Sequence, residues 1–127
     1  MAGSSSSFHE SPDELKPETK DRHRAIVSIM EELEAIDWYD QRIDATQDEE
    51  LRAILAHNRD EEKEHAAMVL EWLRRRDPKF DEDLRNYLFI HKSVLEREEE
   101  LEVAEAGKPA GDDGALGIGS LRAEARR

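Results

Sequence analysis

Two apolar seams constrain the fold of this chain more than any other feature of the sequence. In each seam, successive positions lie alternately four and three residues apart, which is the spacing of a helix face that packs against another helix. The seams consist of Ala25, Ile29, Glu32, Ile36, Tyr39 and Ile43, and of Leu51, Leu55, Asn58, Glu62, His65, Val69 and Trp72. They predict two long helices that pack along each other.

The ends of these helices are marked by residues that start and stop helices. Pro17 suits a first turn, and either Thr46 or Asp48 can cap the second helix after a break at residues 45–48. The pair Asp77 and Pro78 stops the second helix near residue 76. Two helices of about 29 residues, each roughly 43 Å long, would then form an antiparallel hairpin.

The chain outside the hairpin divides by composition. Residues 79–106 predict a shorter C-terminal helix or two helices, and Gly107 ends this region. Five of the six glycines lie in residues 107–119, which is typical of a flexible linker. Residues 1–17 are rich in serine and lack periodicity, as in a mobile tail. We expect three regions: a tail at 1–17, a helical domain at 18–106, and a linker with a terminal peptide at 107–127.

Composition limits what such a chain can do alone. Of its 127 residues, 40% are charged and 37% hydrophobic, which is too polar for a well-filled monomeric core and favours association. A net charge of −13 disfavours nucleic acid and anionic membranes as partners and favours cations. The absence of cysteine excludes disulfides and thiolate metal sites. With no apparent signal peptide or membrane span, we expect a cytoplasmic protein, or one enclosed within the cytoplasm.

Polar residues interrupt both seams at one height of the predicted hairpin. If the turn is centred on Gln47, Glu32 and Glu62 lie equally far before and after it, and therefore level with each other. His65 follows Glu62 by three residues and shares its helix face. Ionisable groups in an apolar seam are costly unless they are paired, neutralised or bound to metal.

The interruption therefore predicts half of a di-metal site. Helical bundles build such sites from two helices that each give a Glu and two that each give Glu-x-x-His, and this chain holds one of each. A second copy related by a two-fold axis would supply the other half. Carboxylates and imidazoles without thiolates suit iron, manganese or zinc, and the donors alone do not choose among them. The alternative is a Glu–His hydrogen-bond network that only fixes the register of the hairpin.

Residues beside the seam suggest supporting roles. Tyr39 lies two turns after Glu32 on the same seam, so its hydroxyl could approach the site, although it could equally be an ordinary core aromatic. Glu31 and Glu34 lie off the seam with Trp38 beside them. They could receive incoming cations, but taken alone the pattern favours a solvated acidic face.

Two continuous runs carry a resemblance to a known family. The runs RHRAIVSIMEELEAIDWYDQRIDAT, at residues 22–46, and ILAHNRDEEKEHAAMVLEWLRRRD resemble the encapsulated ferritins over roughly residues 15–90. These short ferritin-like proteins occupy the lumen of bacterial encapsulin nanocompartments. Residues 116–122 (LGIGSLR), which begin at Leu116 and end at Arg122, resemble the peptide by which cargo docks on the encapsulin shell.

The resemblance implies an architecture and a chemistry. A dimer would complete a ferritin-like four-helix bundle, and dimers would assemble into an annular homodecamer. Glu32, Glu62 and His65 would be the ferroxidase ligands that hold two irons per dimer, with Tyr39 close by and calcium, manganese or zinc as substitutes. A metal-uptake site would use residues that lie off the seam on the first helix, namely Glu31, Glu34 and Trp38.

The sequence therefore predicts an all-α ferroxidase, which oxidises Fe(II) to Fe(III) with dioxygen for storage inside an encapsulin compartment. A hairpin or ring encloses no cavity, so storage would fall to the shell. Two alternatives are a non-enzymatic metal-binding protein and a structural helical-hairpin adaptor.

Overall fold

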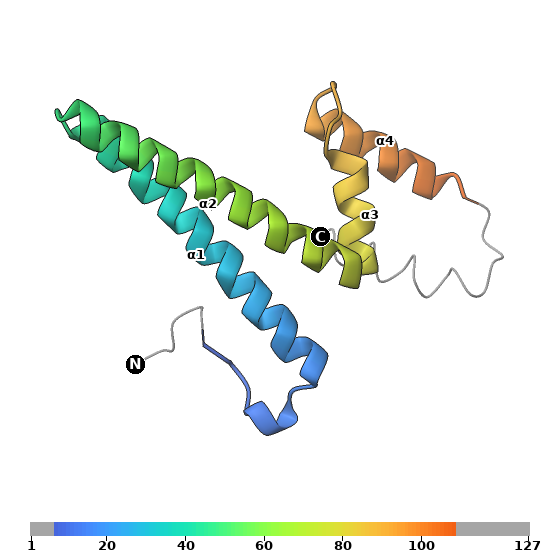
Figure 1. Ribbon diagram of the computed structural model, residues 1–127. Coiled ribbons are helices and arrows are strands. Elements are labelled where there is room, and N and C mark those ends of the chain that lie inside the picture. The colour runs from blue at the N-terminus through green and yellow to red at the C-terminus, as the bar shows by residue number, and fades with distance from the viewer. Residues whose placement is uncertain (1–6, 109–127) are drawn as a thin grey trace. The chain divides into compact units, whose positions relative to one another are not determined.

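The computed structural model of this chain describes residues 7–108, in which all regular structure is helical (Figure 1). The elements are the 3-10 helix η1 (Pro12–Glu14), α1 (Pro17–Ala45), α2 (Glu49–Arg76), α3 (Pro78–Tyr87) and α4 (Val94–Ala106). The chain divides into two compact units at the boundary between Leu84 and Arg85. The prediction of an all-α fold built on two long helices is confirmed.

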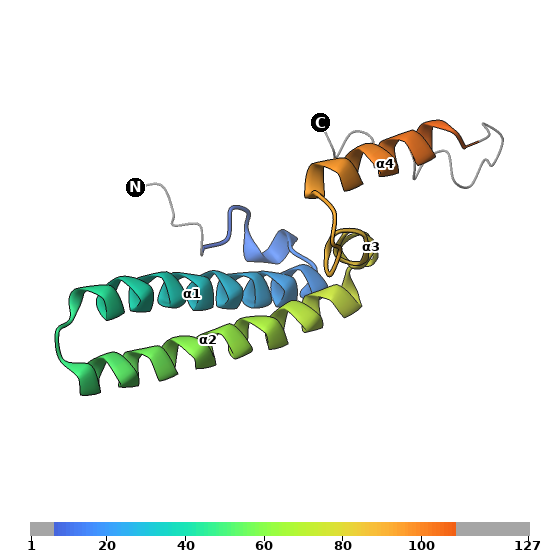
Figure 2. The ribbon, with the colours of Figure 1, turned by 90° about the horizontal axis from the view of Figure 1, so that it is seen from above.

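The hairpin consists of α1 and α2, which run side by side in opposite directions (Figure 2). Asp48 caps α2, since its Oδ1 accepts a hydrogen bond from the Leu51 backbone N–H at 2.9 Å. The connection is held further by Arg52, whose Nε donates to the Ile43 carbonyl at 3.3 Å and whose Nη2 donates to the Thr46 carbonyl at 2.5 Å. These bonds fix the turn, and the turn fixes which residues of the two helices face each other.

An ion pair also links the two helices in the half of the hairpin nearer the turn. Arg59 Nη1 of α2 donates to Asp40 Oδ1 of α1 at 3.0 Å. The two residues are staggered along the hairpin, because Asp40 lies seven residues before Gln47 and Arg59 lies twelve after it, and the long arginine side chain spans the difference.

The hairpin buries very little apolar side-chain surface. Within residues 7–108, only Ala25 and Leu73 are buried hydrophobic residues. Large apolar side chains instead remain exposed on both helices, and among them are Ile26, Met30, Leu33, Ile54 and Met68. A helix pair with one weakly covered seam and exposed apolar flanks lacks a core of its own.

The bend after α2 is formed by the two residues that the sequence predicts to stop the helix. Asp77 takes an extended conformation, and its Oδ1 accepts a hydrogen bond from the Phe80 N–H at 3.0 Å, which caps the next helix. Pro78 is the first residue of α3, where its missing N–H costs nothing.

Within the second unit, a turn at residues 88–93 separates α3 from α4, so the region predicted as one helix or two contains two. Phe89 lies in this turn with a left-handed φ of 61°, and its side chain is 96% exposed. Arg97 Nε donates to the Asn86 carbonyl at 2.9 Å, and Lys92 Nζ donates to Glu100 Oε1 at 2.8 Å. These side chains hold the turn closed.

Residues 7–16 precede α1, within the segment that the sequence predicts as a mobile tail. They contain η1, and the Phe8 ring lies 4.5 Å from the His23 ring of α1, measured between ring centroids. The peptide predicted to dock on a shell, at residues 116–122, lies outside the described residues. In the described part of the chain, no helix combines the length and apolar character that a membrane crossing needs.

Candidate metal centre

Three side chains that the sequence places together do meet in the structure. The ligand atoms of Glu32, from α1, and of Glu62 and His65, from α2, all lie within 4.8 Å of one another. His65 Nδ1 is 3.5 Å from Glu62 Oε2 and 3.9 Å from Glu32 Oε2. A cluster of two carboxylates and one imidazole at this separation has the size of a metal-ligand set. That these residues bind metal stays a prediction.

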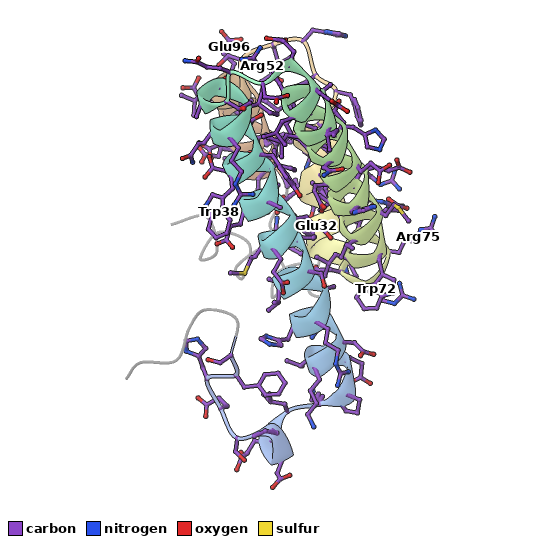
Figure 3. All side chains as sticks on the ribbon, turned by 60° about the vertical axis from the view of Figure 1, so that its left-hand side comes forward. Glu32, Trp38, Arg52, Trp72, Arg75 and Glu96 are labelled. Carbon is purple, nitrogen blue, oxygen red and sulfur yellow. The ribbon has the colours of Figure 1, made fainter. Side chains whose placement is uncertain are left out.

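Local structure explains the meeting. Glu62 and His65 lie one turn apart on α2, so both side chains project from the same face. Glu32 lies on the side of α1 that is turned toward α2 (Figure 3). The register set by the turn then brings Glu32 level with Glu62.

The cluster carries negative charge that the protein's own cations do not balance. Among the described residues, the only ion-pair partner of Glu32 and of Glu62 is His65, which is charged only when it is protonated. Both carboxylates are half-buried, with exposed side-chain fractions of 23% and 24%. Partly buried carboxylates without a fixed cation are costly, and a bound divalent ion removes that cost. The donor set therefore fits a transition metal that accepts oxygen and imidazole ligands.

The cluster is open on one side. The His65 side chain is 47% exposed, twice the fraction of either carboxylate. Met68 and Trp72 follow His65 on the same face of α2 and line a shallow groove with Ala25 and Ser28 of α1. Three donors from one chain also leave a metal ion with unfilled positions. The exposed side of His65 is therefore where further ligands would have to approach.

Tyr39 lies two turns along α1 from Glu32, a rise of about 10 Å along the helix axis. Its ring is half-buried and contacts Arg42, whose guanidinium carbon is 5.6 Å from the ring centroid. Within this chain Tyr39 does not join the cluster, and its predicted place beside the site stays a prediction.

The three residues predicted to take up metal lie on the exposed side of α1. Glu31 and Glu34 are exposed and one turn apart, and Trp38 is 48% exposed and projects away from α2 (Figure 3). Arg42 also contacts this group, since its guanidinium carbon is 5.9 Å from the Trp38 ring centroid. Sequence reasoning missed Arg42, although its spacing of three and four residues from two aromatics is a signal for such a contact.

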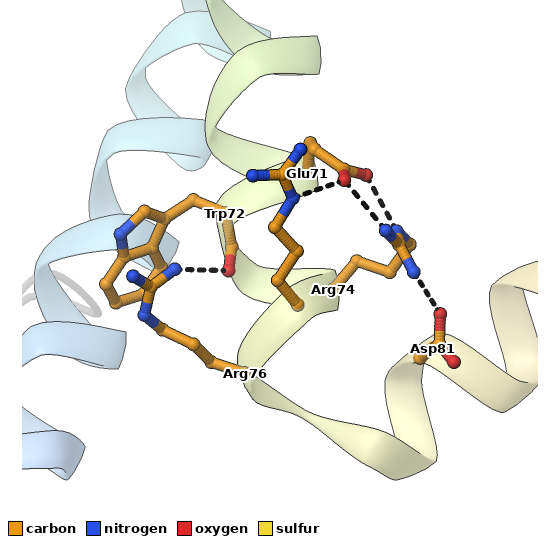
Figure 4. A network of polar contacts seen from close by, with 6 residues as sticks. Glu71, Trp72, Arg74, Arg76 and Asp81 are labelled. Carbon is orange, nitrogen blue, oxygen red and sulfur yellow. Dashed lines mark hydrogen bonds and ion pairs between the residues drawn. The ribbon is translucent and has the colours of Figure 1, made fainter.

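A second polar cluster lies near the C-terminal end of α2 and is fully matched in charge (Figure 4). Arg74 Nε and Nη2 donate to Glu71 Oε1 and Oε2 at 2.7 and 2.8 Å, and Arg75 Nε donates to Glu71 Oε2 at 2.7 Å. Arg74 also forms an ion pair with Asp81 of α3. These two guanidinium groups lower the pKa of Glu71 from 4.5 to about 2. The sequence analysis did not identify this cluster.

Comparisons with known proteins point to one family. The sequence profile of the EncFtn-like family matches residues 7–91. The chain is 60% identical, over 132 aligned positions, to the encapsulated ferritin-like protein of Rhodospirillum rubrum, covering 98% of this chain and 94% of that protein. It is 51% identical to the ferritin-like protein of Thermotoga maritima, covering 90% and 96% of the two chains. It is 36% identical to the encapsulin nanocompartment cargo protein EncC of Myxococcus xanthus, covering 76% and 80%.

A solved structure agrees. The crystal structure of a protein from Nitrosomonas europaea is 62% identical in sequence and superposes with a TM-score of 0.67, covering 68% of this chain and 96% of that one.

Proposed function

Because this chain belongs to the EncFtn-like family, we propose that it is a ferroxidase, which oxidises Fe(II) to Fe(III) with dioxygen while enclosed as cargo in an encapsulin compartment. The observation that carries the proposal is the cluster of Glu32, Glu62 and His65, whose carboxylates have no fixed cation among the described residues. The printed names of two relatives support the setting, since one is encapsulated and the other is an encapsulin cargo protein.

Two copies of the chain complete the centre in this proposal. Around a two-fold axis, each copy contributes one Glu32, one Glu62 and one His65, which together give four carboxylates and two imidazoles. Four carboxylates balance the charge of two divalent ions. The exposed side of His65 and the adjoining groove beside Met68 and Trp72 support docking of a second copy on this face, since both are open in the single chain.

When two Fe(II) ions are bound, they can give two electrons to dioxygen, which with two protons becomes hydrogen peroxide. The chain's own residues prepare that exchange. Glu32 and Glu62 offer hard oxygen donors, which bind Fe(III) more strongly than Fe(II) and so favour the oxidised product. His65 gives one imidazole nitrogen per chain and leaves room for a further ligand.

The acidic surface of α1 supplies iron to the centre in this proposal. Glu31 and Glu34 are exposed beside Trp38, and the net charge of −13 concentrates cations around the protein. Residues 116–122 would address the protein to the shell, where the oxidised iron is stored.

A second exposed surface supports assembly beyond the dimer. Ile26, Met30 and Leu33 follow one another at helical spacing and form an apolar stripe on α1. At about 100° per residue, this stripe lies at least about 100° around α1 from Glu32. A dimer formed on the His65 face would leave the stripe uncovered, so we propose that dimers join through it, as in the annular decamer that the family resemblance implies.

The test is oxygen-dependent iron oxidation by the purified full chain. Wild-type protein should consume dioxygen and form Fe(III), and Glu32→Ala should slow both by tenfold or more. If wild-type protein binds Fe(II) without oxygen and consumes none when air is added, it is a metal-binding protein and not a ferroxidase. If native mass spectrometry finds no bound metal at any iron concentration, the metal centre itself is wrong.

A separate test addresses encapsulation. Removal of residues 116–127 should abolish loading into co-expressed encapsulin shells while leaving Fe(II) oxidation unchanged. Loading that survives this truncation would contradict the role proposed for the peptide.

A further inference from the structure

Arg42 lies against two aromatic rings on the same turn of α1. Its guanidinium carbon is 5.6 Å from the centroid of the Tyr39 ring and 5.9 Å from that of Trp38. Both distances fall within the range in which a guanidinium is attracted to the face of an aromatic ring. One side chain therefore touches the predicted uptake residue Trp38 and the predicted centre residue Tyr39.

Helix geometry explains the contact. Arg42 follows Tyr39 by three residues and Trp38 by four, so it lies one turn beyond both rings and can contact each of them. Helical side chains lean toward the N-terminus, which carries the long Arg42 side chain back over the preceding turn.

The charge of Arg42 is not taken up by a carboxylate. No ion pair of residues 7–108 involves Arg42, whereas Arg24 and Arg59 of the same hairpin each pair with an aspartate. Its position in the last turn of α1 favours a cation, because the helix dipole places partial negative charge at that end. However, the interaction with the helix end requires only a positive charge. It does not require a planar guanidinium packed against two aromatic rings.

Trp38 depends on this contact more than Tyr39 does. The Trp38 side chain is 48% exposed and projects away from α2, whereas Tyr39 is half-buried in the seam. Arg42 is the only cation over the Trp38 ring in the described part of the chain. Without the guanidinium, the indole would be free to change rotamer in solvent.

We propose that Arg42 is a positioning residue for iron uptake: its guanidinium fixes the orientation of Trp38 beside Glu31 and Glu34, and also contacts the Tyr39 ring. This inference rests on the ferroxidase function proposed above. Because the more exposed Trp38 loses most when Arg42 is removed, the effect falls on the capture of Fe(II) rather than on its oxidation.

The experiment compares steady-state Fe(II) oxidation by wild-type protein, Arg42→Ala and Arg42→Lys. We expect Arg42→Ala to raise the KM for Fe(II) about fivefold and to change kcat by less than twofold. Arg42→Lys keeps the charge but loses the planar contact, and should recover less than half of the loss. If Arg42→Lys restores wild-type KM, the helix end explains Arg42 and the inference is wrong.

The matched control is Arg76→Ala. Arg76 lies 4.1 Å above the Trp72 ring at the other end of the hairpin, and its Nη1 donates to the Trp72 carbonyl at 3.3 Å. Its removal deletes the same kind of contact away from the uptake residues. Because Trp72 lines the groove of the proposed dimer face, native mass spectrometry first confirms that the variant assembles as wild type does, and its KM should then be unchanged. An equal rise of KM in both variants would reduce the effect to general loss of stability and overturn the inference.

A second measurement needs no iron, and so separates this inference from the ferroxidase proposal. In a Trp72→Phe background, Trp38 is the only tryptophan. Adding Arg42→Ala should raise acrylamide quenching of Trp38 fluorescence and lower its anisotropy. Unchanged fluorescence would overturn the positioning role, even if wild-type protein oxidises iron. Increased quenching in a protein that oxidises no iron would instead reject the ferroxidase function alone.

Discussion

Two polar clusters on α2 hold the same kind of acid in opposite circumstances. Glu71 accepts hydrogen bonds from two guanidinium groups, and Asp81 pairs with one of them. Glu62 lies nine residues earlier, and its only ion-pair partner in the described part of the chain is the His65 imidazole, which also lies beside a second carboxylate, Glu32. The first cluster is matched in charge, and the second has no lysine or arginine partner among residues 7–108.

The comparison shows that charge balance distinguishes a structural cluster from a set of metal ligands. A carboxylate matched by fixed arginines has no capacity left for an external ion and serves to join elements, here α2 and α3. A carboxylate that the fold leaves without a cation retains its affinity for one. In a chain with this many acidic residues, carboxylates that lack a paired cation indicate a metal site better than the number of acidic residues does.

The largest expected difference between the clusters is in iron oxidation. Glu62→Ala should lower the initial rate by tenfold or more, because it removes a donor from both halves of the proposed dimer centre. Glu71→Ala, on the same helix, should leave the rate within twofold. Stopped-flow absorbance of Fe(III) measures both. Comparable losses of oxidation rate in the two variants would mean that the rate depends on correct folding rather than on metal binding by Glu62.

The next largest difference is in stabilisation by metal. At a free ion concentration about one hundred times its Kd, a ligand stabilises the native state by about 2.7 kcal/mol. Zn²⁺ added to wild-type protein should therefore raise Tm by several degrees. His65→Ala should lose most of this rise, while Arg75→Ala should keep it. Differential scanning calorimetry with and without chelator provides the measurement, and an equal rise in His65→Ala would place the metal elsewhere.

A smaller effect is expected at the bend between α2 and α3. Arg74→Gln removes the link between Glu71 and Asp81, and side chains rather than extensive helix packing hold this bend. Amide hydrogen exchange at residues 78–84 should become several-fold faster, with exchange in the middle of the hairpin unchanged. Faster exchange throughout α1 and α2 would show that the link supports the whole hairpin.

The smallest effect is a pH dependence. The pKa of Glu71 is depressed from 4.5 to about 2 by Arg74 and Arg75, so its stabilising contribution is present above pH 4.5 and is lost as the pH falls toward 2. The Tm difference between wild type and Glu71→Gln should be constant above about pH 4.5 and shrink below it. Added salt should also reduce this difference, because the groups are exposed. A difference that grows toward pH 2 would contradict the assignment.

The sequence predicted the parts that depend on spacing and local chemistry. Asp48, one of the two predicted caps, begins α2, and Asp77 with Pro78 ends it, through backbone preferences that neighbouring structure does not change. The meeting of Glu32 with Glu62 follows from a short turn and regular helices, which leave one register. Such geometry is determined by the chain order alone.

The structural features that the sequence did not predict are those for which several alternatives fit the sequence equally well. Arg74 has several acids within reach, and periodicity does not say that Glu71 and Asp81 are the ones it binds. The turn at Phe89 contains neither glycine nor proline, so the sequence gives no indication of its left-handed backbone conformation. No carboxylate of residues 7–108 pairs with Arg42, which only the structure reveals.

The scarcity of buried residues has a consequence for the life of the protein in a cell. A hairpin that buries little more than Ala25 and Leu73 has a small free energy of unfolding of its own. Its persistence then depends on how soon another copy covers its exposed flanks, and unassembled chains are open to proteases. Degradation of unassembled chains would match the amount of this protein to its capacity for assembly, with no dedicated regulator.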